Sequence, residues 1–215
     1  MIFGIKKLLK NDIYKMKKNV GIFIFDDAEV LDFAGPFEVF SVTSELNNFE
    51  LFDVFTVAKT KTAISAVNGL SVNPTYNFTD CPKVDILILA GGNGTNQAIK
   101  DPAIINWIAE KHQETEITMS ICSGSRFLAK IGALDANPYC THHLVYSDMK
   151  KLVPSGIPIK EKRFTQSNEK TYTSGGISAG IDLSFHVINK LHGKEIIQKT
   201  ATYMEYPIHK EVYDL

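Results

Sequence analysis

The stretch Ile-Thr-Met-Ser-Ile-Cys-Ser-Gly-Ser-Arg-Phe-Leu, residues 117–128, decides how the rest of the chain is organised. Residues 117–121 form a short apolar run rich in β-branched side chains, which predicts a buried strand. Small residues follow at positions 123–125, and apolar residues then recur at helical spacing from Phe127 to Leu134. We therefore expect the chain to turn from strand to helix at Cys122.

A cysteine on such a turn is a candidate nucleophile. The first turn of a helix presents unpaired N–H groups and a partial positive charge, which stabilise a thiolate and lower its pKa below the ~8.5 of a free thiol. Ser120 and Gly124 stand where the serine nucleophile elbow G-x-S-x-G has its glycines. The alternative for Cys122 is the common role of a lone cysteine, a small buried hydrophobic side chain.

Length and composition describe an ordinary globular protein. A chain of 215 residues is long enough for one substantial core, and we expect a single domain over residues 19–215. Its net charge of −1 and its 22% charged residues give no electrostatic reason to expect nucleic-acid binding. The three cysteines are odd in number and irregularly spaced, which indicates a reducing compartment, so we expect a cytoplasmic protein.

The first 18 residues are predicted to be an extension of this domain. They contain six lysines among apolar residues, and therefore lack the uninterrupted apolar region of a signal peptide. They form either an amphipathic helix for a membrane or a partner, or a frayed or locally docked segment, which we favour. No apolar run in the sequence approaches the ~20 residues that span a bilayer, so no membrane association is expected.

The remaining chain alternates predicted strands and helices. Apolar runs that are nearly continuous, and therefore buried on both faces, predict strands at 19–25, 50–59 and 84–90. Helices are expected from about Pro36 with Phe37, Phe40 and Val42 packing inward, over 102–111 with Ile105 and Ile108 buried, and after Cys122, Ile177 and Gly193. A hairpin is predicted at 63–72, and a strand pair around Phe164 and Tyr172. This order predicts a doubly wound α/β fold with a mostly parallel sheet and helices on both faces.

Two further features fall at predicted strand ends, where ligands bind in such sheets. Asp32 follows the first strand, and its carboxyl group is either an acid of the site or a helix cap. Gly91-Gly92 follows the third strand but does not continue as G-x-G-x-x-G, because Gln97 replaces the last glycine, and nucleotide binding is not expected. The two glycines either leave N–H groups for an oxyanion hole or form a tight turn.

Four separated motifs resemble the ThiJ/PfpI superfamily, which is class I glutamine amidotransferase-like. They also resemble, within it, the isonitrile hydratase branch and the sensor domains of AraC-type regulators. The motifs are Val-Leu-Asp-Phe-Ala-Gly-Pro-Phe-Glu-Val-Phe at 30–40, Leu-Ala-Gly-Gly at 89–92, Ser-Ile-Cys-Ser-Gly-Ser at 120–125 and Thr-Ser-Gly-Gly-Ile-Ser-Ala-Gly-Ile-Asp at 173–182. The resemblance extends over roughly residues 19–206 and implies a flavodoxin-like fold and a homodimer. It also implies that Cys122 is the nucleophile and Asp32 the neighbouring acid.

The same resemblance suggests the chemistry of the site. Cys122 attacks the terminal carbon of an isonitrile while Asp32, kept partly protonated by its neighbour's charge, supplies a proton, and water then releases an N-substituted formamide. The Ser123 hydroxyl and the N–H groups near Gly91-Gly92 and Gly176-Ile177 hold the intermediate. His142 is a possible pocket residue. Ser123 stands where the protease-like branches have His, which argues against peptidase activity.

Two other functions remain open, a small-molecule sensor without catalysis and a thiol-based stress protein whose cysteine is oxidised. Against the sensor of a transcription regulator, no helix-turn-helix segment follows within the 215 residues. No cofactor is expected. No metal is expected either, because Cys140, His142 and His143 lack a second ligand group at suitable spacing.

Overall fold

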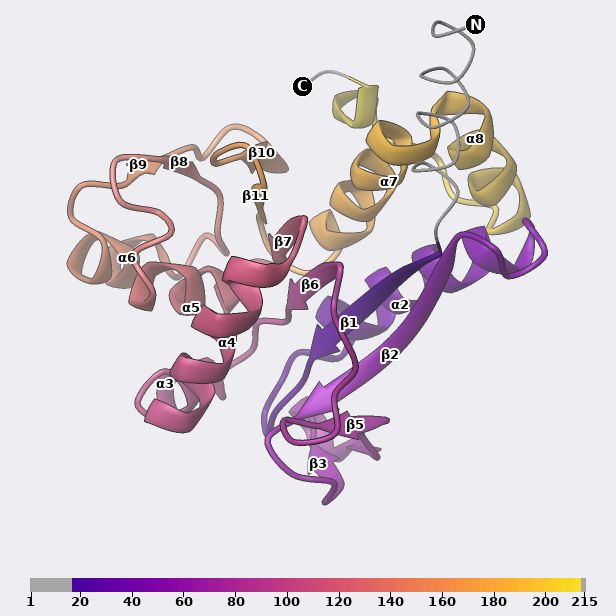
Figure 1. The fold of residues 1–215 in the computed structure, drawn as a ribbon. Helices are drawn as coiled ribbons and strands as arrows, with labels where there is room; N and C mark the ends of the chain where they lie inside the picture. The colour runs from indigo at the N-terminus through magenta and orange to yellow at the C-terminus, as the bar shows by residue number, and fades with distance from the viewer. Residues whose placement is uncertain (1–16, 214–215) are drawn as a thin grey trace, which may run out of the picture.

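The computed structural model describes residues 17–213, whose centre is a seven-stranded sheet (Figure 1). The strand order is β10-β11-β7-β6-β1-β2-β5, and all neighbours are parallel except β10 and β11. The strands are β1 (Lys18–Phe23), β2 (Phe52–Ala58), β5 (Tyr76–Asn77), β6 (Ile86–Leu89), β7 (Ile117–Ser120), β10 (Phe164–Gln166) and β11 (Thr171–Ser174). The predicted doubly wound, mostly parallel α/β architecture is confirmed.

Helices lie on both faces of this sheet because the chain winds in opposite directions from its middle. From β1 it moves to β2, and from β6 it moves the other way to β7, so right-handed crossovers place the connecting helices on opposite faces. One group packs together as α2 (Val30–Glu45), α7 (Ala179–His192) and α8 (Lys194–Tyr203). The other contains α4 (Pro102–Glu114), α5 (Ser125–Lys130) and α6 (Tyr146–Leu152).

Shorter elements complete the fold. The hairpin predicted at 63–72 is confirmed as the antiparallel pair β3 (Ile64–Ser65) and β4 (Ser71–Val72), joined by the 3₁₀ turn η1 (Val67–Gly69). The predicted pairing around Phe164 and Tyr172 is also confirmed, as β10 and β11. The others are α3 (Thr95–Ala98), β8 (Pro138–Tyr139), β9 (Ile157–Pro158) and the 3₁₀ turns η2 (Cys122–Gly124) and η3 (Lys210–Tyr213).

The register of the four middle strands brings their carboxyl ends together. Phe23 at the end of β1 lies opposite Leu89, and Leu89 lies opposite Ser120 at the end of β7. Ser120 in turn pairs with Thr173 of β11. The loops after these strands therefore start at one edge of the sheet, and β1 and β6 form the point where the chain reverses direction, which is where ligands bind in doubly wound sheets.

The core on the α4 and α5 side is aromatic. Phe23 contacts Phe25, Trp107 and Phe127 with ring centroids 5.4, 5.8 and 5.5 Å apart. Phe127 belongs to α5, so this cluster fixes the helix that follows Cys122 against the end of β1. Aromatic pairs at these distances add roughly 0.5–1.5 kcal/mol each to the burial of their surface.

Helix α2 differs from its prediction in two respects. It starts at Val30, so Pro36 lies inside the helix rather than in its first turn. Pro36 has no N–H to donate to the carbonyl of Asp32 one turn earlier, and the surrounding contacts hold the helix together despite that loss. Phe40 and Val42 are buried as predicted, but Phe37 is 36% exposed and points away from the core.

The other differences are at element boundaries. Strands β1, β2 and β6 are shorter than predicted, and the two-residue β5 was not anticipated because it has no apolar alternation. On α4, Ile108 is fully buried while Ile105 is only partly so, and Ile104 and Trp107 are buried instead. Most of the predicted N-terminal extension lies outside the described residues, and Lys18 already belongs to β1. No helix of the described chain is both long and apolar enough to cross a bilayer.

Candidate active site

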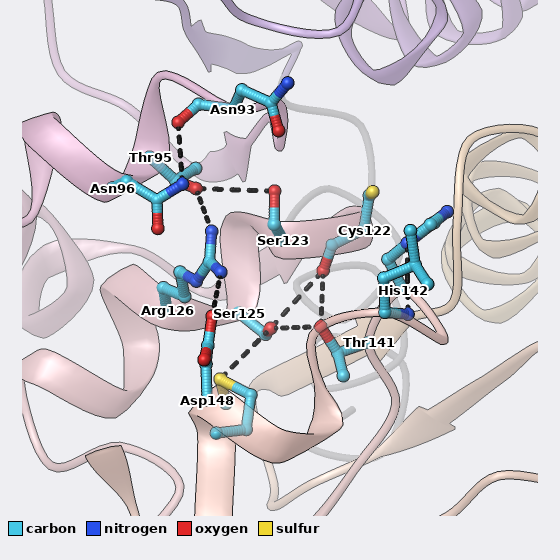
Figure 2. Close-up of polar contacts among 12 residues, drawn as sticks. Asn93, Thr95, Asn96, Cys122, Ser123, Ser125, Arg126, Thr141, His142 and Asp148 are labelled. Carbon is cyan, nitrogen blue, oxygen red and sulfur yellow. Dashed lines mark hydrogen bonds and ion pairs between the residues drawn. The ribbon is translucent and has the colours of Figure 1, made fainter. Parts of the chain in front are cut away.

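Cys122 occupies a strained turn directly after β7. Its φ of 56° is in the left-handed region, which a residue with a side chain adopts only when its surroundings enforce it. The Cys122 N–H donates to Gly175 O at 3.1 Å, and the Cys122 carbonyl accepts from the hydroxyls of Thr141 at 3.0 Å and Ser125 at 3.3 Å (Figure 2). These bonds hold both sides of the turn, and the predicted nucleophile elbow is therefore present as a backbone geometry.

Gly91 lets the end of β6 lie directly against this turn. A Cβ at Gly91 would be 2.6 Å from Asp32 Oδ2, 2.7 Å from Ser123 N and 2.8 Å from Ile121 O. Such distances are far shorter than van der Waals contact, so only glycine fits. The absence of a side chain at position 91 thus allows Asp32 and the Cys122 turn to approach each other across the end of the sheet.

Asp32 is fully buried on the inner side of α2. Its Oδ2 accepts a hydrogen bond from the Gly91 N–H at 3.0 Å, whereas Oδ1 has no hydrogen-bond partner in the described part of the chain. Glu29, and not Asp32, is the cap residue of α2, and the Asp32 side chain caps no helical N–H. The alternative that Asp32 is a helix cap is therefore wrong.

Burial sets the protonation of this carboxyl group. Desolvation raises the pKa of Asp32 to about 7, against the lowering effect of the Gly91 N–H, and the charge of Glu29 raises it further. We expected the charge of a Cys122 thiolate to keep Asp32 protonated, but burial is the main cause of the raised pKa. Near neutral pH, Asp32 exists in both its acid and its carboxylate form.

The Cys122 thiol is 6% exposed, and its pKa is raised rather than lowered. Burial is the largest cause and the neighbouring Asp32 charge the next, and together they bring the pKa to about 12. The N–H groups of Ser123 and Ile177 donate to the sulfur and lower the pKa, but by less. The predicted fall in pKa is wrong because α5 has only six residues and because the site is desolvated.

The glycine loop does not provide the oxyanion hole expected of it. The Gly91 N–H is bonded to Asp32, and the Gly92 N–H donates to Ser123 Oγ at 2.8 Å. The Ser123 hydroxyl in turn donates to the Gly92 carbonyl at 3.0 Å, so it fixes the loop. The N–H groups of Ser123 and Ile177 are the ones directed at the sulfur, and Ile177 adopts a φ of 49° in doing so.

A cavity of about 240 Å³ lies above the thiol. It is lined by Cys122 and Ser123 with Glu29, Gly92, Asn93, Arg126, His142, Leu144, Val145 and Ile177. The structure thus gathers Cys122, Gly92, Ser123, Ile177 and His142 at one cavity, while Asp32 and Gly91 are buried behind it. Gly176 is close by, but its part is to leave room, since a Cβ there would be 2.3 Å from the His142 ring.

His142 is a neutral donor in this cavity. Burial and the neighbouring His143 lower its pKa, and its Nδ1 accepts the Leu144 N–H at 3.3 Å. The remaining proton is then on Nε2. Cys140 is buried and its sulfur donates to the carbonyls of Ile159 and Lys162, so it does not share a site with His142. The described residues contain no group of three side chains suited to a metal ion.

Two pocket residues, Arg126 and Glu29, were not predicted. Arg126 is 6% exposed and donates to Thr95 Oγ1 at 2.8 Å and to Asp148 at 2.5 Å (Figure 2). The Thr95 hydroxyl donates to Gly92 O at 2.8 Å, and its oxygen lies 3.4 Å from Ser123 Oγ. The signal for Arg126 is a charged residue directly before the apolar pair Phe127-Leu128 of α5. Glu29 gave no such signal, because acidic residues before a helix are common.

Comparison with known proteins places this site in a family. The DJ-1/PfpI family model matches residues 18–190. An isonitrile hydratase from Pseudomonas putida is 28% identical over 89% of this chain and 79% of its own length. The transcriptional regulator GbdR of Pseudomonas aeruginosa is 24% identical over 83% of this chain, which spans only 48% of that regulator.

Solved structures share the fold. A ThiJ/PfpI family protein from Pseudomonas syringae superposes with a TM-score of 0.80 at 23% identity, covering 91% of this chain and 79% of its own. Drosophila melanogaster DJ-1beta gives a TM-score of 0.75 at 18% identity, covering 89% and 100%. The chain therefore belongs to the DJ-1/PfpI family, as its motifs indicated. That family includes enzymes such as isonitrile hydratase as well as the regulators to which this chain is related.

Proposed function

We propose that this protein is a cysteine-dependent hydratase that converts an isonitrile into an N-substituted formamide. The observation that carries the proposal is the pair formed by Asp32 and Cys122. Besides burial, the Asp32 charge raises the pKa of the Cys122 thiol, and Asp32 Oδ1 has no hydrogen-bond partner in the described part of the chain. We choose this substrate class among small electrophiles because an isonitrile hydratase is a relative in the same family, at 28% identity.

The pair holds the single proton that the first step requires. An isonitrile carbon accepts a nucleophile only if it also gains a proton. The pKa values of about 7 and about 12 leave one proton on the pair over most of the neutral and alkaline range. The Cys122 sulfur bonds to the carbon while Asp32 transfers the thiol proton to the same carbon, which gives a neutral thioimidate, R–N=CH–S–Cys122.

Hydrolysis of the thioimidate regenerates the enzyme. Asp32 as carboxylate removes a proton from water, whose oxygen bonds to the carbon, and the nitrogen is protonated. The carbon–sulfur bond then breaks, the sulfur regains a proton, and R–NH–CHO leaves. The overall change is the addition of one water to the isonitrile. The N–H groups of Ser123 and Ile177 stabilise negative charge on the sulfur in both steps.

Incubation with an alkyl or aryl isonitrile tests this function, with the N-formyl amine as the measured product. We expect formamide from the wild-type protein and none from Cys122→Ala, with Cys140→Ala as the matched control because Cys140 is buried away from the cavity. Absence of formamide from the wild-type protein with every isonitrile offered would refute the proposal.

A binding module without catalysis is the second candidate, favoured by the relation to regulators such as GbdR. In that case small molecules would raise the melting temperature without being converted. The stress-protein alternative has less support, because oxidation proceeds through the thiolate and the pKa of Cys122 is about 12.

We also propose that the protein is a cytoplasmic homodimer. Leu31 and Phe37 on α2 are 37% and 36% exposed, and Ile177 nearby in the site is 37% exposed. Large apolar side chains at the surface are typical of contacts between copies. Cys81, Cys122 and Cys140 are free thiols, as in a reducing compartment. Light scattering at micromolar concentration should give twice the monomer mass.

A further inference from the structure

The charges around the cavity do not cancel, and Glu29 provides the excess. Arg126 is neutralised by Asp148, whose carboxylate lies 2.5 Å away. Burial holds much of Asp32 in its neutral acid form, and His142 is neutral because its pKa is lowered. Among the residues that line the cavity, Glu29 is left as a carboxylate without a salt bridge in the described chain; its charge raises the pKa of His142, but burial makes the net shift of that imidazole downward.

The carboxylate of Glu29 has no partner in residues 17–213. It takes part in no side-chain hydrogen bond and no salt bridge, although it occupies the cap position of α2, where a side chain usually bonds to a helical N–H. Its backbone is held in place, since the Glu29 N–H donates to Gly91 O at 2.9 Å. The backbone at Glu29 is thus fixed, and the residue lines the cavity without a hydrogen-bond partner for its side chain in the described residues.

This carboxylate is unfavourable for the site in the absence of a ligand. Its negative charge raises the pKa of Asp32, which means that it repels the carboxylate form of the acid next to the nucleophile. A half-buried charge that opposes its neighbour and satisfies no internal group is expected where a ligand of opposite sign compensates it. The exposed Asn93, which carries a carboxamide group, also lines the cavity.

We propose that Glu29 selects a substrate that carries an ammonium group. This rests on the proposed hydratase function and adds the nature of the substrate's side chain. The cavity of about 240 Å³ has the thiol at its floor and the apolar side chains of Leu144, Val145 and Ile177 on its walls. A molecule that fits has an electrophilic carbon at Cys122, a short apolar chain and a cation that donates hydrogen bonds to Glu29.

Two isosteric isonitriles test the proposal directly. The 3-ammoniopropyl and n-butyl compounds differ by replacement of NH₃⁺ with CH₃ at the chain end, so their sizes match while the charge differs. We expect kcat/KM for the ammonium compound to be about 10- to 100-fold higher, the range of a charge-assisted hydrogen bond. Added salt should reduce this ratio, because an exposed charge pair is screened.

Charge variants assign the effect to one residue. Glu29→Gln should bring the ratio of the two kcat/KM values close to one. Glu38→Gln removes the same charge from an exposed position on the same helix and should leave the ratio unchanged. Equal rates for the two isonitriles with the wild-type protein, or an unchanged ratio in Glu29→Gln, would overturn the proposal.

A second measurement separates this proposal from the hydratase function. If the wild-type protein hydrates no isonitrile offered, these two included, the function is refuted, and protection of Cys122 from iodoacetamide decides whether Glu29 binds a cation. Butylammonium should then slow the alkylation of Cys122, while 1-butanol at the same concentration should not. Equal protection by the two compounds would refute cation selection independently of turnover.

Discussion

Asp32 and Asp182 are both fully buried, but the protein surrounds them differently. Asp182 lies on α7, where Arg163 Nε donates to its Oδ2 at 2.5 Å and the Tyr206 hydroxyl to its Oδ1 at 3.0 Å. Asp32 receives one N–H from Gly91 and leaves an oxygen empty. Full partnering of Asp182 suits a structural ion pair, and partial partnering of Asp32 leaves a group that can gain and lose a proton.

Replacement of Asp32 should have the largest effect on turnover. Asp32→Asn keeps the shape but cannot exchange a proton, so formamide production should fall by the ~10²–10⁴-fold typical of losing general acid–base catalysis. Asp182→Asn should leave the turnover of the folded protein within about twofold, because the Asp182 carboxylate is bonded to Arg163 and Tyr206 and not to Cys122 or Asp32. Normal turnover in a folded Asp32→Asn protein would show that Asp32, like Asp182, transfers no proton in the reaction.

For stability, replacement of Asp182 should have the larger effect and replacement of Asp32 the smaller one. Asp182→Asn leaves Arg163 without its anion and should lower the free energy of unfolding by roughly 2–3 kcal/mol, less than for a fully buried pair because the Arg163 side chain is 34% exposed. Urea denaturation would measure this loss. Asp32→Asn should cost less at neutral pH, where the carboxylate form of Asp32 is itself unfavourable. An equal loss of unfolding free energy in both variants would contradict the different roles of the two acids.

The stability that Asp32 provides should depend on pH. The folded pKa of Asp32, about 7, is above its unfolded value of 3.8, so its acid form is favoured by folding. The stabilisation that Asp32 provides relative to Asp32→Asn is full below about pH 4 and should be lost as the pH rises to about 7 and beyond, by an amount on the order of 4 kcal/mol. Denaturation of the wild-type and Asp32→Asn proteins at pH 4.5, 6 and 8 would measure this loss. A difference in unfolding free energy that stays constant over these pH values would contradict the prediction.

Alkylation of Cys122 should show the smallest effect. The Asp32 charge raises the pKa of the thiol, so Asp32→Asn should increase the rate with iodoacetamide at pH 8 by about threefold to tenfold. Cys140, which is distant from Asp32, is the internal control in the same digest. A slower reaction of Cys122 in the variant would mean that Asp32 activates the thiol in the resting state instead of opposing its ionisation.

The sequence predicted those parts of the site that depend on strand order. Apolar runs that precede Cys122, Gly91 and the segment with Asp32 predicted three groups at one edge of a parallel sheet, and the register of β1, β6 and β7 brings the ends of these strands together. The family motifs predicted the neighbourhood of Asp32 and Cys122. The roles of these groups as acid and nucleophile remain predictions until the variants are measured.

The parts that were missed depend on desolvation and on hydrogen-bond partners. The pKa of Cys122 is raised because the residue is only 6% exposed, and no local sequence pattern predicts that burial. The N–H groups of Gly91 and Gly92 are occupied by Asp32 and Ser123, and these partners come from separate segments. Glu29 was overlooked because only the folded chain shows that its carboxylate caps no helix.

The lack of a side chain at Gly91 also defines how the substrate range of this site could be redesigned. A single methyl group there would overlap Asp32, Ser123 and Ile121 at the same time, so random libraries should keep position 91 constant. Leu144 at the mouth of the cavity is 73% exposed and can change size without disturbing the core. The close packing at Gly91 therefore has to stay constant, whereas exposed cavity residues such as Leu144 can be varied to change the substrate range.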